Sequence, residues 1–217
     1  MKIAIIGGTG KEGKGLAYRW AKAGHEVIIG SRQLEKAQRS AEELNEEKKG
    51  IKAVKGEQNS DAAQQAEIIV ITVPFIAHVA TLEAIRNEVQ GKIVVDVTVP
   101  LVPPKVSTVH IPAAGSAAME AQAVLGDEVR VVSAFQNVSY EKLMDDLAQI
   151  SDVLVCGNDR EAKETLIRLI DDAGMKGFDA GALQNSIVSE GMTSVLININ
   201  KKFGVHSAGI KIIGLED

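Results

Sequence analysis

The chain begins Lys2-Ile-Ala-Ile-Ile-Gly7-Gly8-Thr9-Gly10-Lys11-Glu12-Gly13, an apolar run that leads into a glycine-rich turn. Gly8, Gly10 and Gly13 have the GxGxxG spacing. In a strand–turn–helix unit the first of these glycines permits the tight turn, the second lets the backbone approach a pyrophosphate, and the third allows close helix–strand packing. The amide groups of the turn then lie at a helix N-terminus, which favours a phosphate. The opening therefore predicts a dinucleotide-binding site.

Strand-like and helix-like segments alternate along almost the whole chain. Residues 67–73 and 92–97 are continuous apolar runs, which are typical of strands buried on both faces of a parallel sheet. Further strands are expected at residues 3–7, 26–30, 51–54, 129–135 and 152–156. Helices are expected at residues 13–23, 34–47, 116–125, 140–147 and 160–173, with a short one capped near residues 60 and 61. The pattern predicts an α/β protein with a Rossmann-type doubly wound, mostly parallel sheet.

The second predicted strand ends in Gly30-Ser31-Arg32, and Lys36 lies one turn into the next helix. A site for NAD carries an acidic residue at this strand end, where it binds the ribose 2′-hydroxyl. Here the strand end has a hydroxyl and two cations instead, and these suit a 2′-phosphate. The sequence therefore predicts NADP as the cofactor. The expected contacts are made by Gly8, Thr9, Gly10, Lys11, Glu12, Gly13, Ser31, Arg32 and Lys36.

Two further loops should reach the same edge of the sheet. Residues 72–75 follow the fourth strand, and the proline-rich residues 97–104 follow the fifth. In an open α/β sheet the nicotinamide half of the cofactor lies at this edge. The proline-rich loop is either a wall of a pocket for a flat ring or simply a stiff connection. His78 can approach this loop, and Asp96 can orient its amide groups.

Composition excludes several classes of protein. The 217 residues carry a net charge of −5, which argues against a nucleic-acid partner. The single cysteine, Cys156, excludes an intrachain disulfide framework, and no cluster has metal-ligand spacing. No apolar run approaches the roughly 20 residues that span a bilayer. We therefore expect a cytoplasmic protein with no membrane contact and no metal.

The character of the sequence changes after Gly181. Apolar residues at helical spacing run from residue 185 to residue 203, Gly204 is a plausible helix end, and a short apolar tail follows. We expect residues 1–180 to form the NADP-binding domain and residues 181–217 to form a small C-terminal helical segment that covers the cofactor cleft. Because this segment has a large apolar surface, it should contribute to a homodimer or a higher homo-oligomer.

Motifs along nearly the whole chain resemble the NADP oxidoreductases that use the deazaflavin coenzyme F420. The resemblance begins with the glycine-rich turn, Gly24-His25-Glu26 and Gly30-Ser31-Arg32. It continues through residues 92–95, 101–103, 131–134 and 156–157. It ends with Asp179-Ala180-Gly181-x-Leu183-x-Asn185-Ser186, the most specific part, and Gly209-Ile210-Lys211.

The resemblance implies direct hydride transfer between NADP(H) and F420, with the two rings stacked in one cleft. It places Val73, Pro74, Val99 and Asn137 beside the nicotinamide half of NADP. It places Pro100, Phe135 and Gln136 on the F420 side. Where the family typically has a histidine this chain has Gln136, an amide that can donate a hydrogen bond but cannot titrate near neutral pH.

No catalytic acid or base is expected, because the reactive carbons belong to the two cofactors and the protein has to align them. Two other functions fit the same residues. One is an NADPH-dependent flavin or ferric reductase of similar build. The other is a non-catalytic protein that binds NADP and reports redox state to a partner.

Overall fold

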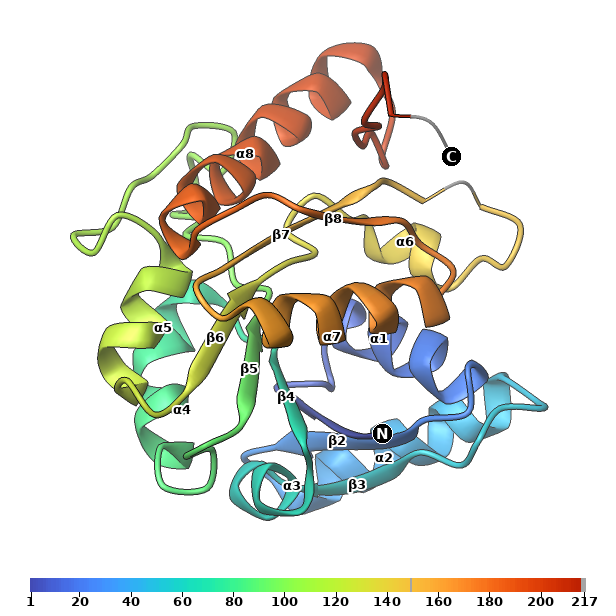
Figure 1. The fold of residues 1–217 in the computed structure, drawn as a ribbon. Helices are drawn as coiled ribbons and strands as arrows, with labels where there is room; N and C mark the ends of the chain where they lie inside the picture. Colours follow the sequence, from blue (N-terminus) through green and yellow to red (C-terminus); the bar gives the residue numbers. More distant parts are fainter. Residues whose placement is uncertain (149, 216–217) are drawn as a thin grey trace.

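A single eight-stranded sheet forms the centre of the molecule, with helices on both faces (Figure 1). The computed structural model describes residues 1–148 and 150–215. The strands are β1 (Lys2–Ile6), β2 (Glu26–Ser31), β3 (Lys55–Gln58), β4 (Ile68–Ile71), β5 (Ile93–Asp96), β6 (Arg130–Ser133), β7 (Val153–Gly157) and β8 (Gly177–Asp179). Their order across the sheet is β3-β2-β1-β4-β5-β6-β7-β8.

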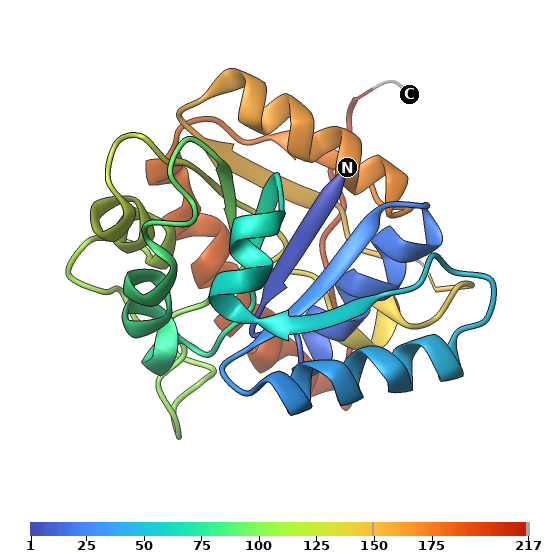
Figure 2. The ribbon, with the colours of Figure 1, turned by 90° about the horizontal axis from the view of Figure 1, so that it is seen from below.

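The helices connect these strands in turn. They are α1 (Lys11–Lys22), α2 (Leu34–Glu47), α3 (Asn59–Gln65), α4 (His78–Ile85), α5 (Ala117–Leu125), α6 (Tyr140–Leu143), α7 (Arg160–Asp172) and α8 (Ser186–Phe203), with 3-10 turns η1 (Phe75–Ala77) and η2 (Leu183–Asn185). Figure 2 shows α2 alongside β3 at one end of the sheet and α7 near the other end. No helix in the described part of the chain is long and apolar enough to cross a membrane.

The apolar strands place alternate side chains in two cores, one on each face of the sheet. Ile3 and Ile5 of β1 belong to a core that includes Trp20 of α1, whereas Ala4 and Ile6 belong to a core that includes Leu82 of α4. Successive side chains of a strand point to opposite faces, so a strand covered on both sides must be apolar at every position. This is the reason for the continuous apolar runs in the sequence.

Strand direction matches the predicted fold class. The strands β1 to β6 pair in parallel, and so do β7 and β8, but β7 runs antiparallel to β6. The doubly wound, mostly parallel sheet with a C-terminal helix is therefore confirmed. The single reversal at β7 has no signature in the apolar pattern, because β7 is a short apolar strand like the parallel strands β4 and β5.

Two predicted elements were misplaced. The third strand is Lys55–Gln58, not residues 51–54, because its register is set by pairing with β2 and by Gly56, where a side chain would collide with the backbone of Ala37. The helix predicted at residues 140–147 ends at Leu143. Its carbonyl groups there accept hydrogen bonds from the buried guanidinium of Arg19, which lies on α1.

The C-terminal segment packs on loops that follow β5 and β6. Glu190 of α8 accepts hydrogen bonds from the first two amide groups of α5, at 2.7 and 3.1 Å, and Thr193 Oγ1 donates to the carbonyl of Gln136 at 2.6 Å. Helix α8 ends as predicted at Gly204, which has a φ of 64°. Residues 216 and 217 of the predicted segment lie outside the described residues.

Candidate functional site

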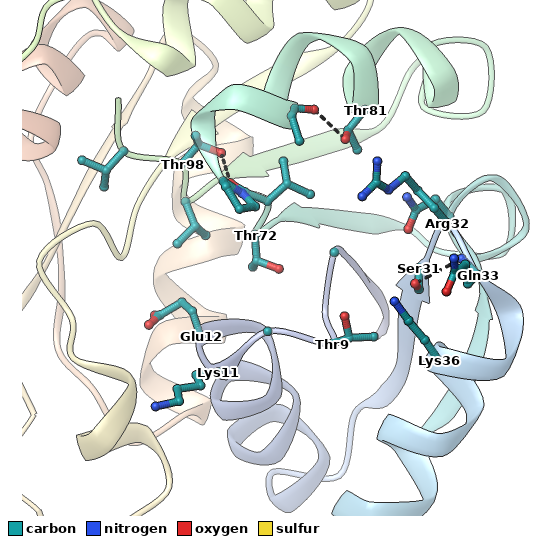
Figure 3. A pocket seen from close by; sticks show the side chains of 18 of the residues that line it. Thr9, Lys11, Glu12, Ser31, Arg32, Gln33, Lys36, Thr72, Thr81 and Thr98 are labelled. Carbon is teal, nitrogen blue, oxygen red and sulfur yellow. Dashed lines mark hydrogen bonds between the residues drawn. The ribbon is translucent and has the colours of Figure 1, made fainter. Parts of the chain in front are cut away.

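A pocket with a volume of about 540 Å³ opens at the carboxyl ends of β2, β1, β4 and β5. This volume lies within the usual range for small-molecule sites of about 300–1,000 Å³. The chain leaves β1 toward β2 in one direction and leaves β4 toward β5 in the other, so the pocket lies at the switch point where α/β sheets bind ligands. Figure 3 shows the side chains that line it.

The glycine-rich turn forms the floor of the pocket, and the space around each glycine explains why a larger residue would not fit there or would fill the pocket. Gly7 has a φ of 75°, so the left-handed residue of the turn is Gly7 and not Gly8. At Gly8 a Cβ would lie 2.7 Å from the carbonyl oxygen of Ile5, and at Gly13 it would lie 2.6 Å from the Cα of Gly8. At Gly10 the nearest atom would be 3.8 Å away, so this residue leaves open space for a ligand.

Helix α1 begins at Lys11, two residues before the predicted start, and its first turn is open to an anion. Its N-cap is Gly10, which has no side chain to accept hydrogen bonds from the free amide groups of the first turn. Those amide groups and the helix dipole favour a phosphate at this point. The ammonium of Lys11 lies beside the turn and donates to Tyr140 Oη at 3.0 Å. The turn therefore suits the pyrophosphate of a dinucleotide.

The end of β2 supplies the second anion site. Ser31, Arg32 and Lys36 all line the pocket, and Figure 3 shows them together on one side of it. The Ser31 hydroxyl accepts a hydrogen bond from the amide of Gln33 at 3.2 Å, which leaves its proton free to donate to a ligand. Arg32 and Lys36 are exposed, and neither forms an ion pair with any residue in the ranges 1–148 and 150–215. Two unpaired cations and a hydroxyl suit a 2′-phosphate.

The opposite end of the pocket is mostly apolar. Val73 and Pro74 line it from the loop after β4, and Val99 lines it from the loop after β5. In the loop after β5, the backbone amide of Thr98 donates a hydrogen bond to Asp96 Oδ1 at 2.9 Å. A flat, weakly polar ring fits this part of the pocket better than a phosphate does, because it offers apolar walls and no cation.

Glu12 is an acid whose carboxyl group lacks a partner. Its Oε1 is buried and accepts no hydrogen bond within the described chain, although Glu12 lines the pocket. Burial raises the pKa of Glu12 to about 8. The carboxyl group is therefore largely neutral at pH 7, and it does not oppose a phosphate as an ionised acid would.

Six of the predicted contact residues do not line this pocket: Gly8 and Gly13, which the close packing of the turn requires, and Pro100, Phe135, Gln136 and Asn137. Phe135 is 1% exposed and packs edge-on against Trp20, with ring centroids 5.8 Å apart. Gln136 Nε2 donates to the carbonyl of Asp96 at 2.8 Å, and Asn137 Nδ2 donates to the carbonyl of Asp152 at 2.7 Å. Pro100 is buried in the loop between two lining residues. Pro100, Phe135, Gln136 and Asn137 are therefore all buried within the protein.

Other lining residues were not singled out as contacts. They are Gly7, Gln33, Asn59, Thr72, Ala77, Thr81, Val97, Thr98 and Leu101. Most of them belong to loops that the strand pattern had already placed at this edge. Asn59 is different, because it begins α3 directly after the misplaced third strand. Correct placement of that strand would have put Asn59 beside Ser31.

Comparisons with known proteins agree with this geometry. Residues 2–100 match the family model described as NADP oxidoreductase, coenzyme F420-dependent. The whole chain is 42% identical to the F420-dependent NADP reductase of Methanocaldococcus jannaschii and 40% identical to that of Methanothermobacter marburgensis. Both alignments cover 100% of this chain and 100% of the relative.

Solved structures show the same architecture. A crystal structure from Arthrobacter sp. FB24, of a candidate F420-dependent NADP reductase, superposes with a TM-score of 0.83 and is 28% identical over 99% of this chain and 100% of that one. A Plasmodium falciparum pyrroline carboxylate reductase with NADP bound superposes with a TM-score of 0.62 at 14% identity, over 94% of this chain and 66% of that one. The second likeness shows the fold alone. Full-length identity of about 40%, together with the family match, places this chain in the F420-dependent NADP reductase family.

Proposed function

We propose that this enzyme transfers a hydride directly between NADP(H) and coenzyme F420. The observation that carries this proposal is the pocket at the switch point, which has phosphate-binding features at two places and an apolar end. The relatives that match over their full length are named F420-dependent NADP reductases. When bound, the nicotinamide and deazaflavin rings supply the hydride donor and acceptor, and the protein has to bind and align them.

The residues divide the binding work between them. The amide groups of the turn at residues 9–13 hold the pyrophosphate, and Ser31, Arg32 and Lys36 hold the 2′-phosphate. Val73 and Val99 form walls for the nicotinamide half, so that the ring is held in one orientation and shielded from water. Alignment of this kind is worth several orders of magnitude in rate for a bimolecular transfer.

The F420 ring is proposed to lie against the loops at the rim of the apolar end. Ile76, which precedes the lining residue Ala77, is 98% exposed, and Val102, which follows the lining residue Leu101, is 45% exposed. Exposed apolar side chains at a pocket mouth are suited to a flat aromatic ligand. The loop of Pro100 after β5 and the loop of Phe135 and Gln136 after β6 are proposed to support this rim, as part of the F420 side.

The C-terminal segment is proposed to form the subunit interface of a homodimer and to border the F420 side of the cleft. Its surface carries many apolar side chains: the exposed large hydrophobic residues are Ile187, Val188, Val195, Phe203, Val205, Ile212, Ile213 and Leu215. Among the described residues, none after Leu101 lines the NADP pocket. The cytoplasmic location expected from the sequence stays a prediction.

An absorbance assay tests the function directly. Purified protein and NADPH should rapidly bleach the visible absorbance of oxidised F420, and reduced F420 should convert NADP⁺ to NADPH in the reverse direction. NADH in the place of NADPH should be a poor donor. Fast reduction of FMN or FAD without F420 turnover would point to the flavin-reductase alternative, and tight NADPH binding with no turnover on either acceptor would point to the sensor.

A further inference from the structure

His78 is a fully buried histidine placed between two carboxylates. It begins α4, and its side chain is 0% exposed. Its Nε2 lies 2.8 Å from Asp96 Oδ2, and its Nδ1 lies 3.3 Å from Glu120 Oε2. An ionised carboxylate can only accept a hydrogen bond, so both ring nitrogens must carry a proton to satisfy both partners. The geometry therefore favours an imidazolium at this position.

The charges around His78 favour that imidazolium. Burial alone would lower the pKa of His78, but the charges and hydrogen bonds of Asp96 and Glu120 outweigh burial and raise it. Glu190 of α8 is a further acid whose charge interacts with both His78 and Asp96. The ring of Phe75 stacks on the imidazole, with centroids 6.2 Å apart. Strand β5 and helices α5 and α8 thus all present acids toward this one cation.

Asp96 connects the buried cation to the wall of the pocket. While Oδ2 pairs with His78, Oδ1 accepts the amide hydrogen of Thr98 at 2.9 Å. The Asp96 carbonyl oxygen accepts a hydrogen bond from Gln136 at 2.8 Å. Residues 97–99 line the apolar end of the pocket, and Figure 3 shows Thr98 on that side, well away from Arg32. The orientation of the Asp96 carboxylate therefore sets the backbone position of this wall.

We propose that His78 is a positioning residue for the nicotinamide half of NADP(H), acting through Asp96 on the wall formed by residues 97–99. His78 touches no ligand itself. Its imidazolium holds the Asp96 carboxylate in the rotamer that fixes the Thr98 amide. The inference rests on the proposed binding of NADP in this pocket, and it predicts that the two halves of the cofactor depend on His78 differently.

A half-cofactor separates the two effects. 2′,5′-ADP carries the adenosine half and its 2′-phosphate but no nicotinamide, so it occupies the end of the pocket near Arg32 and does not reach the wall. In the full-length protein, His78→Gln should weaken NADPH binding about tenfold, the order expected for loss of one charged hydrogen bond, and should leave 2′,5′-ADP binding unchanged. Titration calorimetry measures both affinities.

His25→Gln is the matched control. His25 also pairs with a carboxylate, Asp172, at 3.0 Å, but it lies just before β2, at the opposite edge of the sheet from the pocket. This control should bind both ligands like the wild type. Equal loss of both ligands in folded His78→Gln, or loss of neither, would overturn the inference. Failure of the wild type to bind either ligand would instead overturn the proposed function.

A second measurement needs no substitution in the cluster, in case His78→Gln does not fold. Because its pKa is raised, His78 is charged at low pH and loses its charge as pH rises through the folded-state pKa. From pH 8 upward the phosphates of both ligands are ionised, and Glu190, whose pKa burial raises to about 7, is largely ionised as well. The ratio of NADPH affinity to 2′,5′-ADP affinity should therefore fall as pH rises from 8 through the folded-state pKa of His78. It should be measured in Glu12→Gln protein, which removes the pocket acid with a pKa of about 8, and a ratio that stays constant up to the pH at which the protein unfolds would refute the inference.

Discussion

Replacement of Arg32 by alanine should separate the two nicotinamide cofactors. Arg32 is exposed at the end of β2, lines the pocket and has no ion-pair partner in the described chain, so its loss should cost the fold almost nothing. A hydrogen bond to a charged group contributes about 1.5–3 kcal/mol, and solvent screening places an exposed group at the low end of that range. Arg32→Ala should therefore weaken NADPH about tenfold and leave the weaker binding of NADH unchanged.

Fluorescence titration of each cofactor against wild type and variant measures this effect. The loss for NADPH should shrink at high salt, because the interaction is between exposed charges. Arg39→Ala is the matched control, since Arg39 is an exposed arginine of α2 that does not line the pocket. If Arg32→Ala weakened NADH and NADPH equally, Arg32 would not contact the 2′-phosphate, and the assignment of NADP from the β2 end would lose its main support.

Three further outcomes follow from individual residues. Gly10→Ala should bind NADPH poorly but unfold at the wild-type temperature, because the new Cβ enters the pocket and not the protein interior. Gly13→Ala should unfold at a lower temperature, because its Cβ would lie 2.6 Å from the Cα of Gly8. Thermal melts and NADPH titrations of both variants test these outcomes. Glu12→Gln should stabilise the protein by an amount that grows as pH rises from about 4.5 to about 8 and is constant above pH 8. The reason is that the buried acid has a pKa of about 8, so it resists the ionisation that the unfolded chain permits. A difference in melting temperature between wild type and variant that did not change across this range would contradict the prediction. Glu190→Gln should lower the melting temperature by about 2–10 °C. The two carboxylate oxygens of Glu190 accept hydrogen bonds from two backbone amide groups of α5, whereas a glutamine side chain has one acceptor oxygen. An unchanged melting temperature would show that solvent replaces the carboxylate.

Much of the fold could be predicted from local patterns. The strands β1, β2, β4 and β5 and helix α2 agree closely with the expected segments, because their apolar periodicity is strong. The weak edge strand β3 was misplaced, since its position depends on pairing with β2 and on the close approach of α2 at Gly56. Helix α6 was overextended, because its end is set by Arg19, more than one hundred residues away in the chain.

Part of the site could likewise be predicted from the sequence, and part could not. The glycine-rich turn and the Ser31–Arg32–Lys36 group were identified from the sequence, and the structure brings them into one pocket. Phe135, Gln136 and Asn137 were expected beside the ligands, but their side chains are buried and bonded to the protein interior. A loop can be placed at a sheet edge from its strand, but the direction of each side chain depends on what packs against it.

The sequence by itself therefore predicts the dinucleotide-binding turn, the preference for a 2′-phosphate and the α/β class. Each of these depends on residues that lie close together in the chain. The contact between His78, Asp96 and Glu120 could not be predicted, since it joins α4, β5 and α5. The left-handed turn at Gly7 and the unpartnered Glu12 carboxyl also emerge from packing. Short-range patterns specify which elements form, whereas burial and through-space charge, which depend on the assembled sheet, specify how the pocket walls are held.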